Sequence, residues 1–209
     1  MKGFTDLWID ADGDELERIL DIANMMGYKV LCISRDFTRH RFVKQKNVFL
    51  VKKKVIAEAG EKNLKEKLRG VKVGYPVVAV IPLDVQAARL AARDGRVDII
   101  VLNKDSLDHI DKTQALMMKQ FMKILEVPLN DFLKYSNRVK SMIYRRIHMF
   151  YYYGVPIVYS SHAKSWNELI HPRSIVGLIN SLLGVDKKLI VYSMSSFMVE
   201  FLAKNGVRV

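Results

Sequence analysis

The amino-acid sequence predicts an α/β protein, a TIM-like β/α barrel. Short apolar runs rich in β-branched residues alternate about seven or eight times with longer segments of helical periodicity over 209 residues. Such alternation is typical of a parallel sheet built from strand–helix units. The number of units favours a closed barrel, and the length is near the lower limit of about 200 residues for that fold. An open, doubly wound sheet is the alternative, because the pattern alone does not prove closure.

Seven segments have the composition of strands, being short, apolar and bounded by polar or turn-forming residues. They are residues 4–9, 28–34, 47–56, 75–81, 97–102, 124–128 and 155–161. Residues 189–192 are either an eighth strand or part of a helix.

The first helix has clear start and stop signals. Asp12 and Asp14 are expected to open it, because aspartate caps free backbone N–H groups and favours the positive end of the helix dipole. Gly27 is expected to end it. Further helices are predicted over residues 61–69, 84–94, 113–122, 131–153, 172–183 and 195–204. With no linker and no repeat between these elements, the sequence predicts one domain over residues 1–209.

The charge balance points to a polyanionic partner. Lys and Arg number 34 against 22 Asp and Glu, a formal net charge of +12. Such an excess favours nucleic acid or an acidic membrane surface. No stretch approaches the roughly 18 apolar residues of a membrane span, and the start lacks the apolar stretch of a signal peptide. The one cysteine, Cys32, allows neither an internal disulfide nor a cysteine zinc site, so we expect a cytoplasmic protein. We also expect no membrane partner.

Signatures of catalysis are scarce. The sequence holds no phosphate-binding glycine motif and no G-x-S-x-G, and its histidines lack metal-ligand spacing. Only one acidic cluster suggests a Mg²⁺ site, and helix capping explains part of it: Asp6, Asp10, Asp12, Asp14 and Glu15. We therefore predict no catalytic residue and no metal ligand. A residual metal-dependent phosphoesterase remains the alternative, supported by this cluster and His162.

Two basic stripes lie on predicted helices. Arg89, Arg93 and Arg96 share one helix face. A second stripe on the predicted helix 131–153 consists of Lys134, Arg138, Arg145 and His148. Both stripes have few carboxylates nearby in the sequence, whereas an ordinary solvated face interleaves the two signs. The stripes therefore predict phosphate contacts. The tyrosines at 151–153 are expected to pack rather than to stack on bases.

Two stretches carry a family resemblance. Residues 83–102 contain the pattern R-x-x-x-x-x-G-x-V-D from Arg89 to Asp98, and residues 158–179 contain S-S-H-A followed by Trp166 and H-P-R. Together they resemble archaeal ribonuclease P protein component 3. The resemblance implies a barrel related to the polymerase-and-histidinol-phosphatase metalloenzymes. Those enzymes open with D-L-H-x-H, and here Trp8 and Asp10 stand at the histidine positions, so we expect no such metal site.

The resemblance also implies a function. It implies a subunit of ribonuclease P, the endoribonuclease whose RNA, with Mg²⁺, cleaves precursor tRNA at the mature 5′ end. The protein itself would bind no cofactor and would support the RNA together with protein component 2 and other ribonuclease P proteins. The RNA contacts implied by position, or predicted from the stripes, are Arg89, Arg93, Lys104, Lys119, Lys123, Lys164 and Arg173. A protein scaffold that does not touch RNA is a third hypothesis.

Overall fold

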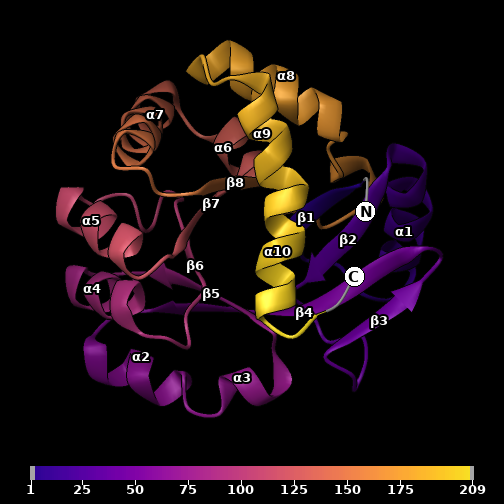
Figure 1. The fold of residues 1–209 in the computed structure, drawn as a ribbon, viewed down its shortest axis with the longest axis horizontal. Helices are drawn as coiled ribbons and strands as arrows, with labels where there is room; N and C mark the ends of the chain where they lie inside the picture. The colour runs from indigo at the N-terminus through magenta and orange to yellow at the C-terminus, as the bar shows by residue number, and fades with distance from the viewer. Residues whose placement is uncertain (1–2, 208–209) are drawn as a thin grey trace. The chain divides into compact units, whose positions relative to one another are not determined.

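The computed structural model describes residues 3–207 and shows a largely parallel sheet with helices between its strands (Figure 1). The strands are β1 (Phe4–Ile9), β2 (Tyr28–Ile33), β3 (Phe42–Gln45), β4 (Val48–Glu58), β5 (Val77–Pro82), β6 (Ile99–Val101), β7 (Ile124–Pro128) and β8 (Ile157–Ser160). The helices are α1 (Gly13–Met26), α2 (Glu61–Lys67), α3 (Val71–Gly74), α4 (Val85–Arg93), α5 (Lys112–Gln120), α6 (Leu129–Lys134), α7 (Asn137–Tyr152), η1 (Trp166–Glu168), α8 (Pro172–Leu183), α9 (Lys187–Met194) and α10 (Ser196–Lys204).

The strand order is β1-β2-β4-β5-β6-β7-β8, with β3 paired to β4 off this path. The pairs β1–β2, β2–β4, β5–β6 and β6–β7 are parallel, whereas β3 runs antiparallel to β4. Beyond β8, Ala163 forms a parallel bridge with Ile9 of β1. The α/β class and the parallel strand–helix topology predicted from the sequence are confirmed.

The structure decides one open alternative and corrects the prediction elsewhere. Residues 189–192, predicted as a strand or as part of a helix, lie within α9. The short strand β3 was not predicted. The helix expected over residues 131–153 is two helices, because the backbone of Tyr135 and Ser136 is extended between α6 and α7.

The helix ends follow the predicted signals with one exception. Gly27 ends α1 in the left-handed region at φ 86°, as expected for a glycine at this position. Asp84 caps α4 by accepting a hydrogen bond from the N–H of Ala87. Asp12 does stand at the cap position of α1, but its side chain accepts no capping hydrogen bond, so the capping role predicted for it is wrong.

Contacts within the chain define two compact units. The first holds the described residues up to Lys53, then Gly74–Pro76, and the residues from Tyr159 onward. The second holds Lys54–Val73 and Val77–Val158. The strands β4 and β8 each pass from one unit into the other. The single domain predicted for residues 1–209 stays a prediction.

In the first unit, the buried face of α1 packs on the sheet. Leu16, Ile19, Leu20 and Ala23 join the apolar cluster that also contains residues of β1, β2 and β4. At the edge of this cluster the buried Tyr28 donates its hydroxyl to the carbonyl of Ile170 at 2.6 Å. This bond ties the start of β2 to the segment before α8.

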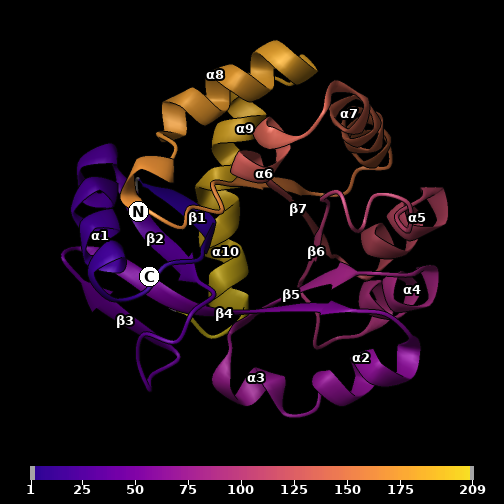
Figure 2. The ribbon, with the colours of Figure 1, turned by 180° about the vertical axis from the view of Figure 1, so that it is seen from behind.

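In the second unit, α2, α4, α5 and α7 follow one another as neighbours (Figure 2). The buried face of α4 consists largely of alanines, which let the helix approach the sheet closely, and they are Ala87, Ala88, Ala91 and Ala92. These helices carry Arg89, Arg93, Lys119, Arg138 and Arg145 from the basic residues singled out in the sequence. None of the helices in the described chain combines the length and the apolar character that a membrane span requires.

Candidate nucleic-acid interface

The three arginines of the first basic stripe all have carboxylate partners. Arg89 lies 2.6 Å from Asp111, and Arg96 lies 2.6 Å from Asp94. Arg93 lies 3.1 Å from Glu61 of α2. The prediction that these arginines lack carboxylate neighbours is therefore wrong, because two of the partners come from other helices that the spacing along α4 does not reveal.

Arg89 is the most constrained of the three. It donates to Asp111 and, at 3.1 Å, to the side-chain oxygen of the buried Gln114. Asp111 caps α5 by accepting from the N–H of Gln114, and the hydrogen bond from Arg89 holds the pKa of its carboxyl below the usual value, against the effect of burial. Arg89 thus joins α4 to the start of α5, and its charge is already partly neutralised.

Lys123 was predicted to contact RNA, and its position in the structure contradicts that prediction. The residue is buried, and its ammonium donates to the carbonyls of Asp94 and Val97 at 2.7 and 2.5 Å. Burial lowers the pKa of Lys123, which the nearby Asp98 and Asp94 partly offset. A buried ammonium with two carbonyl partners stabilises the chain after α4 and does not offer its charge to a phosphate.

The second basic stripe has a different environment. Helix α7 contains no acidic residue, and four of its cations have no ion pair with any residue from 3 to 207: Arg138, Lys140, Arg145 and Arg146. Arg138 and Arg145 are exposed and seven residues apart, so they share the face opposite the buried Ile143 and Ile147. Lys134 belongs to α6 and is not part of this face.

Aromatic side chains accompany the cations of α7. Tyr144 and His148 lie with their ring centroids 4.5 Å apart, and Tyr152 is 84% exposed. The packing role predicted for Tyr152 is therefore wrong. We call the exposed set Arg138, Tyr144, Arg145, His148 and Tyr152 the α7 surface. Unpaired arginines beside exposed aromatic rings can contact both phosphates and unstacked bases.

The other predicted contacts of the second unit lie on α5 and in the loop after β6. Lys119 is exposed on α5, which packs beside α7, and its ammonium approaches Gly154 just after α7. Lys112 of α5, which was not predicted, lies 5.9 Å from the ring centre of Tyr153. Lys104 is exposed in the loop after β6, where its backbone N–H donates to the hydroxyl of Tyr135.

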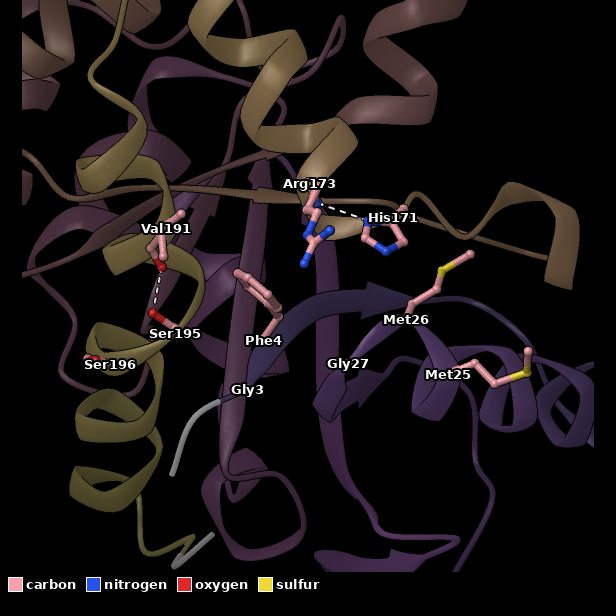
Figure 3. A pocket seen from close by; sticks show the side chains of 10 residues that line it. All are labelled: Gly3, Phe4, Met25, Met26, Gly27, His171, Arg173, Val191, Ser195 and Ser196. Carbon is pink, nitrogen blue, oxygen red and sulfur yellow. Dashed lines mark hydrogen bonds between the residues drawn. The ribbon is translucent and has the colours of Figure 1, made fainter.

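The two predicted contacts of the first unit lie between the end of β8 and the first turn of α8. Lys164 is exposed, and its backbone N–H donates to Glu168. Arg173 is exposed in the first turn of α8, and its backbone N–H donates to Nδ1 of His171. Figure 3 shows the guanidinium of Arg173 pointing into a cavity next to Phe4.

The carboxylates of the first strand make bonds to the chain itself. Asp6 is buried and accepts from the N–H groups of Trp8 and Ser161. Burial raises the pKa of Asp10, but hydrogen bonds from Ser34 and Arg35 outweigh it and leave that pKa below its usual value. Among residues 3–207, no three His, Cys, Asp or Glu side chains are grouped so that they could hold a metal ion.

Trp8 fills the space beside these carboxylates. Its ring stacks on His162 with centroids 3.8 Å apart, and the ammonium of the buried Lys53 lies 4.7 Å from its centre. His162 has a left-handed backbone at φ 54°, which is uncommon for a residue with a side chain. An indole thus stands at the first histidine position of the D-L-H-x-H pattern, where it offers no metal ligand.

Comparison with known proteins places this architecture in one family. The family model described as RNase P subunit p30 matches residues 3–205. A search of curated proteins found no match. A chain from the cryo-EM structure of archaeal ribonuclease P with mature tRNA superposes with a TM-score of 0.75 at 14% identity, over 94% of this chain and 90% of that one.

A second structure extends the likeness in fold. The crystal structure of an uncharacterized protein matches with a TM-score of 0.66 at 11% identity, over 99% of this chain and 75% of that one. At these identities the likeness concerns the fold alone. With the strand order described above, it confirms the α/β, TIM-like barrel class.

Proposed function

The chain belongs to the RNase P subunit p30 family, and we propose that, as a protein subunit of ribonuclease P in tRNA processing, it binds the RNA of that complex through the α7 surface. The solved structure that resembles it is of archaeal ribonuclease P with mature tRNA, which supports RNA and tRNA as partners of the complex. We propose the α7 surface as the part of this chain that contacts the RNA.

The unpaired cations of α7 carry the proposal. In the same unit, the arginines of the first basic stripe form ion pairs with Asp111, Glu61 and Asp94, whereas Arg138 and Arg145 have no carboxylate partner among the described residues. A surface of uncompensated positive charge repels itself. A bound polyanion neutralises that charge, and the arginines release the counterions condensed on the polyanion.

The chemistry follows from this division of roles. The RNA of ribonuclease P performs the hydrolysis of the precursor tRNA with Mg²⁺, and this chain lowers the repulsion between phosphates. The chain itself is not catalytic and holds no metal: Asp6 and Asp10 are engaged by backbone N–H groups, Ser34 and Arg35, which supports that part of the proposal.

The proposed partners are ribonuclease P RNA, protein component 2, the other proteins of the complex and precursor tRNA as its substrate. Among the predicted contacts, we propose Lys104, Lys119, Lys164 and Arg173 as further RNA contacts. Arg89 and Arg93 are proposed as secondary contacts, since both have carboxylate partners. We also propose a cytoplasmic location, where a single buried cysteine outside a disulfide, such as Cys32, is ordinary.

The test is reconstituted cleavage of precursor tRNA at limiting Mg²⁺, with and without this protein and component 2. We expect the protein to lower the Mg²⁺ requirement and Arg138→Ala with Arg145→Ala to weaken that effect. The matched control is Lys62→Ala with Lys65→Ala on α2, which removes the same charge from a helix where Lys65 is paired with Glu61. Equal effects of the two double variants, or no effect of the protein, would overturn the proposal.

A further inference from the structure

A cavity of about 670 Å³ lies in the first unit, and its lining residues are different from those of the α7 surface. Its lining comes from the start of β1, the end of α1, the start of α8, and the junction of α9 with α10 (Figure 3). All of these segments belong to the same compact unit. The volume falls within the range of roughly 300–1,000 Å³ that is usual for sites of small ligands.

One wall of the cavity is apolar. Phe4 offers an aromatic ring, and Met26 and Val191 add aliphatic and thioether surface. Met25 also lines it and is 86% exposed, an unusual position for a large apolar side chain. Flexible methionines adapt to flat or irregular apolar partners, and an aromatic ring is a platform on which a base can stack.

Another part of the lining is polar and basic. No residue from 3 to 207 hydrogen-bonds to the guanidinium of Arg173 or pairs with it, and Figure 3 shows it directed into the space above Phe4. The Ser195 hydroxyl donates to the carbonyl of Val191 at 2.6 Å, so its oxygen can still accept. The exposed Ser196 makes no side-chain hydrogen bond within the described chain.

We propose that this cavity binds one unpaired nucleotide of an RNA partner, with the base against Phe4 and the methionines and the phosphate on Arg173. The inference rests on the proposed function, because it takes RNA as the ligand of the chain. A lone phosphate would leave the apolar wall uncovered, and a purely apolar ligand would bury Arg173 without a partner, which is costly. A nucleotide would cover the apolar side chains with its base and pair Arg173 with its phosphate.

The test measures binding of adenosine, adenosine 5′-monophosphate and hexaadenylate to the full chain by calorimetry or NMR titration. Ser196→Trp fills the cavity from an exposed position, and Ser181→Trp, exposed on α8 outside the lining, is its control. We expect Ser196→Trp to lower the affinity for both phosphorylated ligands about tenfold or more, which is the scale of one stacked base. Ser181→Trp is expected to bind them with the affinity of the native protein.

A second pair of variants separates phosphate from base. Arg173→Gln is expected to lower the affinity for adenosine 5′-monophosphate about tenfold and that for adenosine only a little, because only the monophosphate carries a negatively charged phosphate. Lys187→Gln removes one charge from α9 outside the lining and is expected to change neither. Equal losses for both ligands in Arg173→Gln would contradict the assignment of the phosphate to Arg173.

The outcomes distinguish this inference from the proposed function. If Ser196→Trp leaves hexaadenylate binding intact while the complex still binds ribonuclease P RNA, the nucleotide site is wrong and the proposed function stands. If the monophosphate binds and the hexamer gains nothing over it, the cavity takes a free nucleotide and the RNA assignment is overturned. If the complex binds no ribonuclease P RNA at all, the proposed function itself fails.

Discussion

The guanidinium of Arg89 on α4 and the carboxylate of Asp111, the capping residue of α5, lie 2.6 Å apart. A contact of this kind fixes one helix against the start of the next. Any loss of RNA binding on substitution of Arg89 therefore mixes a lost phosphate contact with a weakened α4–α5 packing. The α7 arginines, which make no such contact, report on RNA binding more directly.

Arg89→Ala is expected to lower the free energy of unfolding by about 1–2 kcal/mol, because it removes charge-assisted hydrogen bonds at a half-buried site. Arg93→Ala on the same helix is the control. Its pair with Glu61 is exposed on both sides, so about 0–1 kcal/mol is expected. Urea unfolding measures both variants. Equal stability of the two would show that Arg89 has no structural role.

The same pair predicts a pH dependence of stability. The pKa of Asp111 is lower in the folded chain than its ordinary 3.8. The folded state thus prefers the charged carboxylate, and the resulting stabilisation is present above pH 3.8 and is lost as the pH falls through the lower folded pKa. Asp111→Asn should be less stable than the native protein at neutral pH, and thermal unfolding should show this difference shrinking in acid. A difference that stays constant down to the acid limit would exclude the linkage.

Lys123→Ala should destabilise the fold without a direct effect on RNA. The variant leaves the carbonyls of Asp94 and Val97 without their donor, which costs about 1–3 kcal/mol for buried polar groups. RNA affinity, measured well below the unfolding temperature, should stay within error of the native value. Lower affinity in a fully folded variant would restore Lys123 as an RNA contact.

Arg138→Ala with Arg145→Ala should change the salt dependence of RNA binding by the reconstituted complex. Each phosphate contact contributes about 0.7–0.9 to the slope of log affinity against log salt, so two lost contacts should reduce the slope by about 1.5. The α2 double variant at Lys62 and Lys65 should keep the native slope. A lower affinity with an unchanged slope would assign the two arginines to something other than phosphate.

Periodicity along the chain predicts most of this fold. The apolar face of α1, from Leu16 to Ala23, is buried as the spacing indicates, and Gly27 ends the helix where a left-handed residue is needed. Residues 189–192 were ambiguous because a four-residue apolar run fits a strand or a buried helix turn equally well. The break at Tyr135 and Ser136 carries neither glycine nor proline, and its signal is Ser136, a residue type preferred at helix starts.

The site was less accessible to prediction because charge compensation is a tertiary property. The sequence places Arg89 and Asp111 22 residues apart, and only the packing of α4 on α5 brings them into contact. The burial of Lys123 is likewise decided by the loop that follows α4, which supplies the two carbonyls. By contrast, the basic character of α7 could be recognised from its own composition. The helix contains no Asp or Glu that could neutralise its cations.

The hairpin strand β3 also bears on how the protein behaves in concentrated solution. Within the described chain β3 pairs only with β4, so its outer edge leaves backbone N–H and C=O groups open to a strand from another copy. The strand is four residues long, and Arg41, Lys44 and Lys46 are exposed on or beside it. Two copies approaching edge to edge would bring these cations together. Lys46 is paired with Glu17 and Asp21, so Arg41 and Lys44 supply the repulsion. The same kind of charge that attracts a polyanion thus opposes self-association through this edge, and high salt screens it.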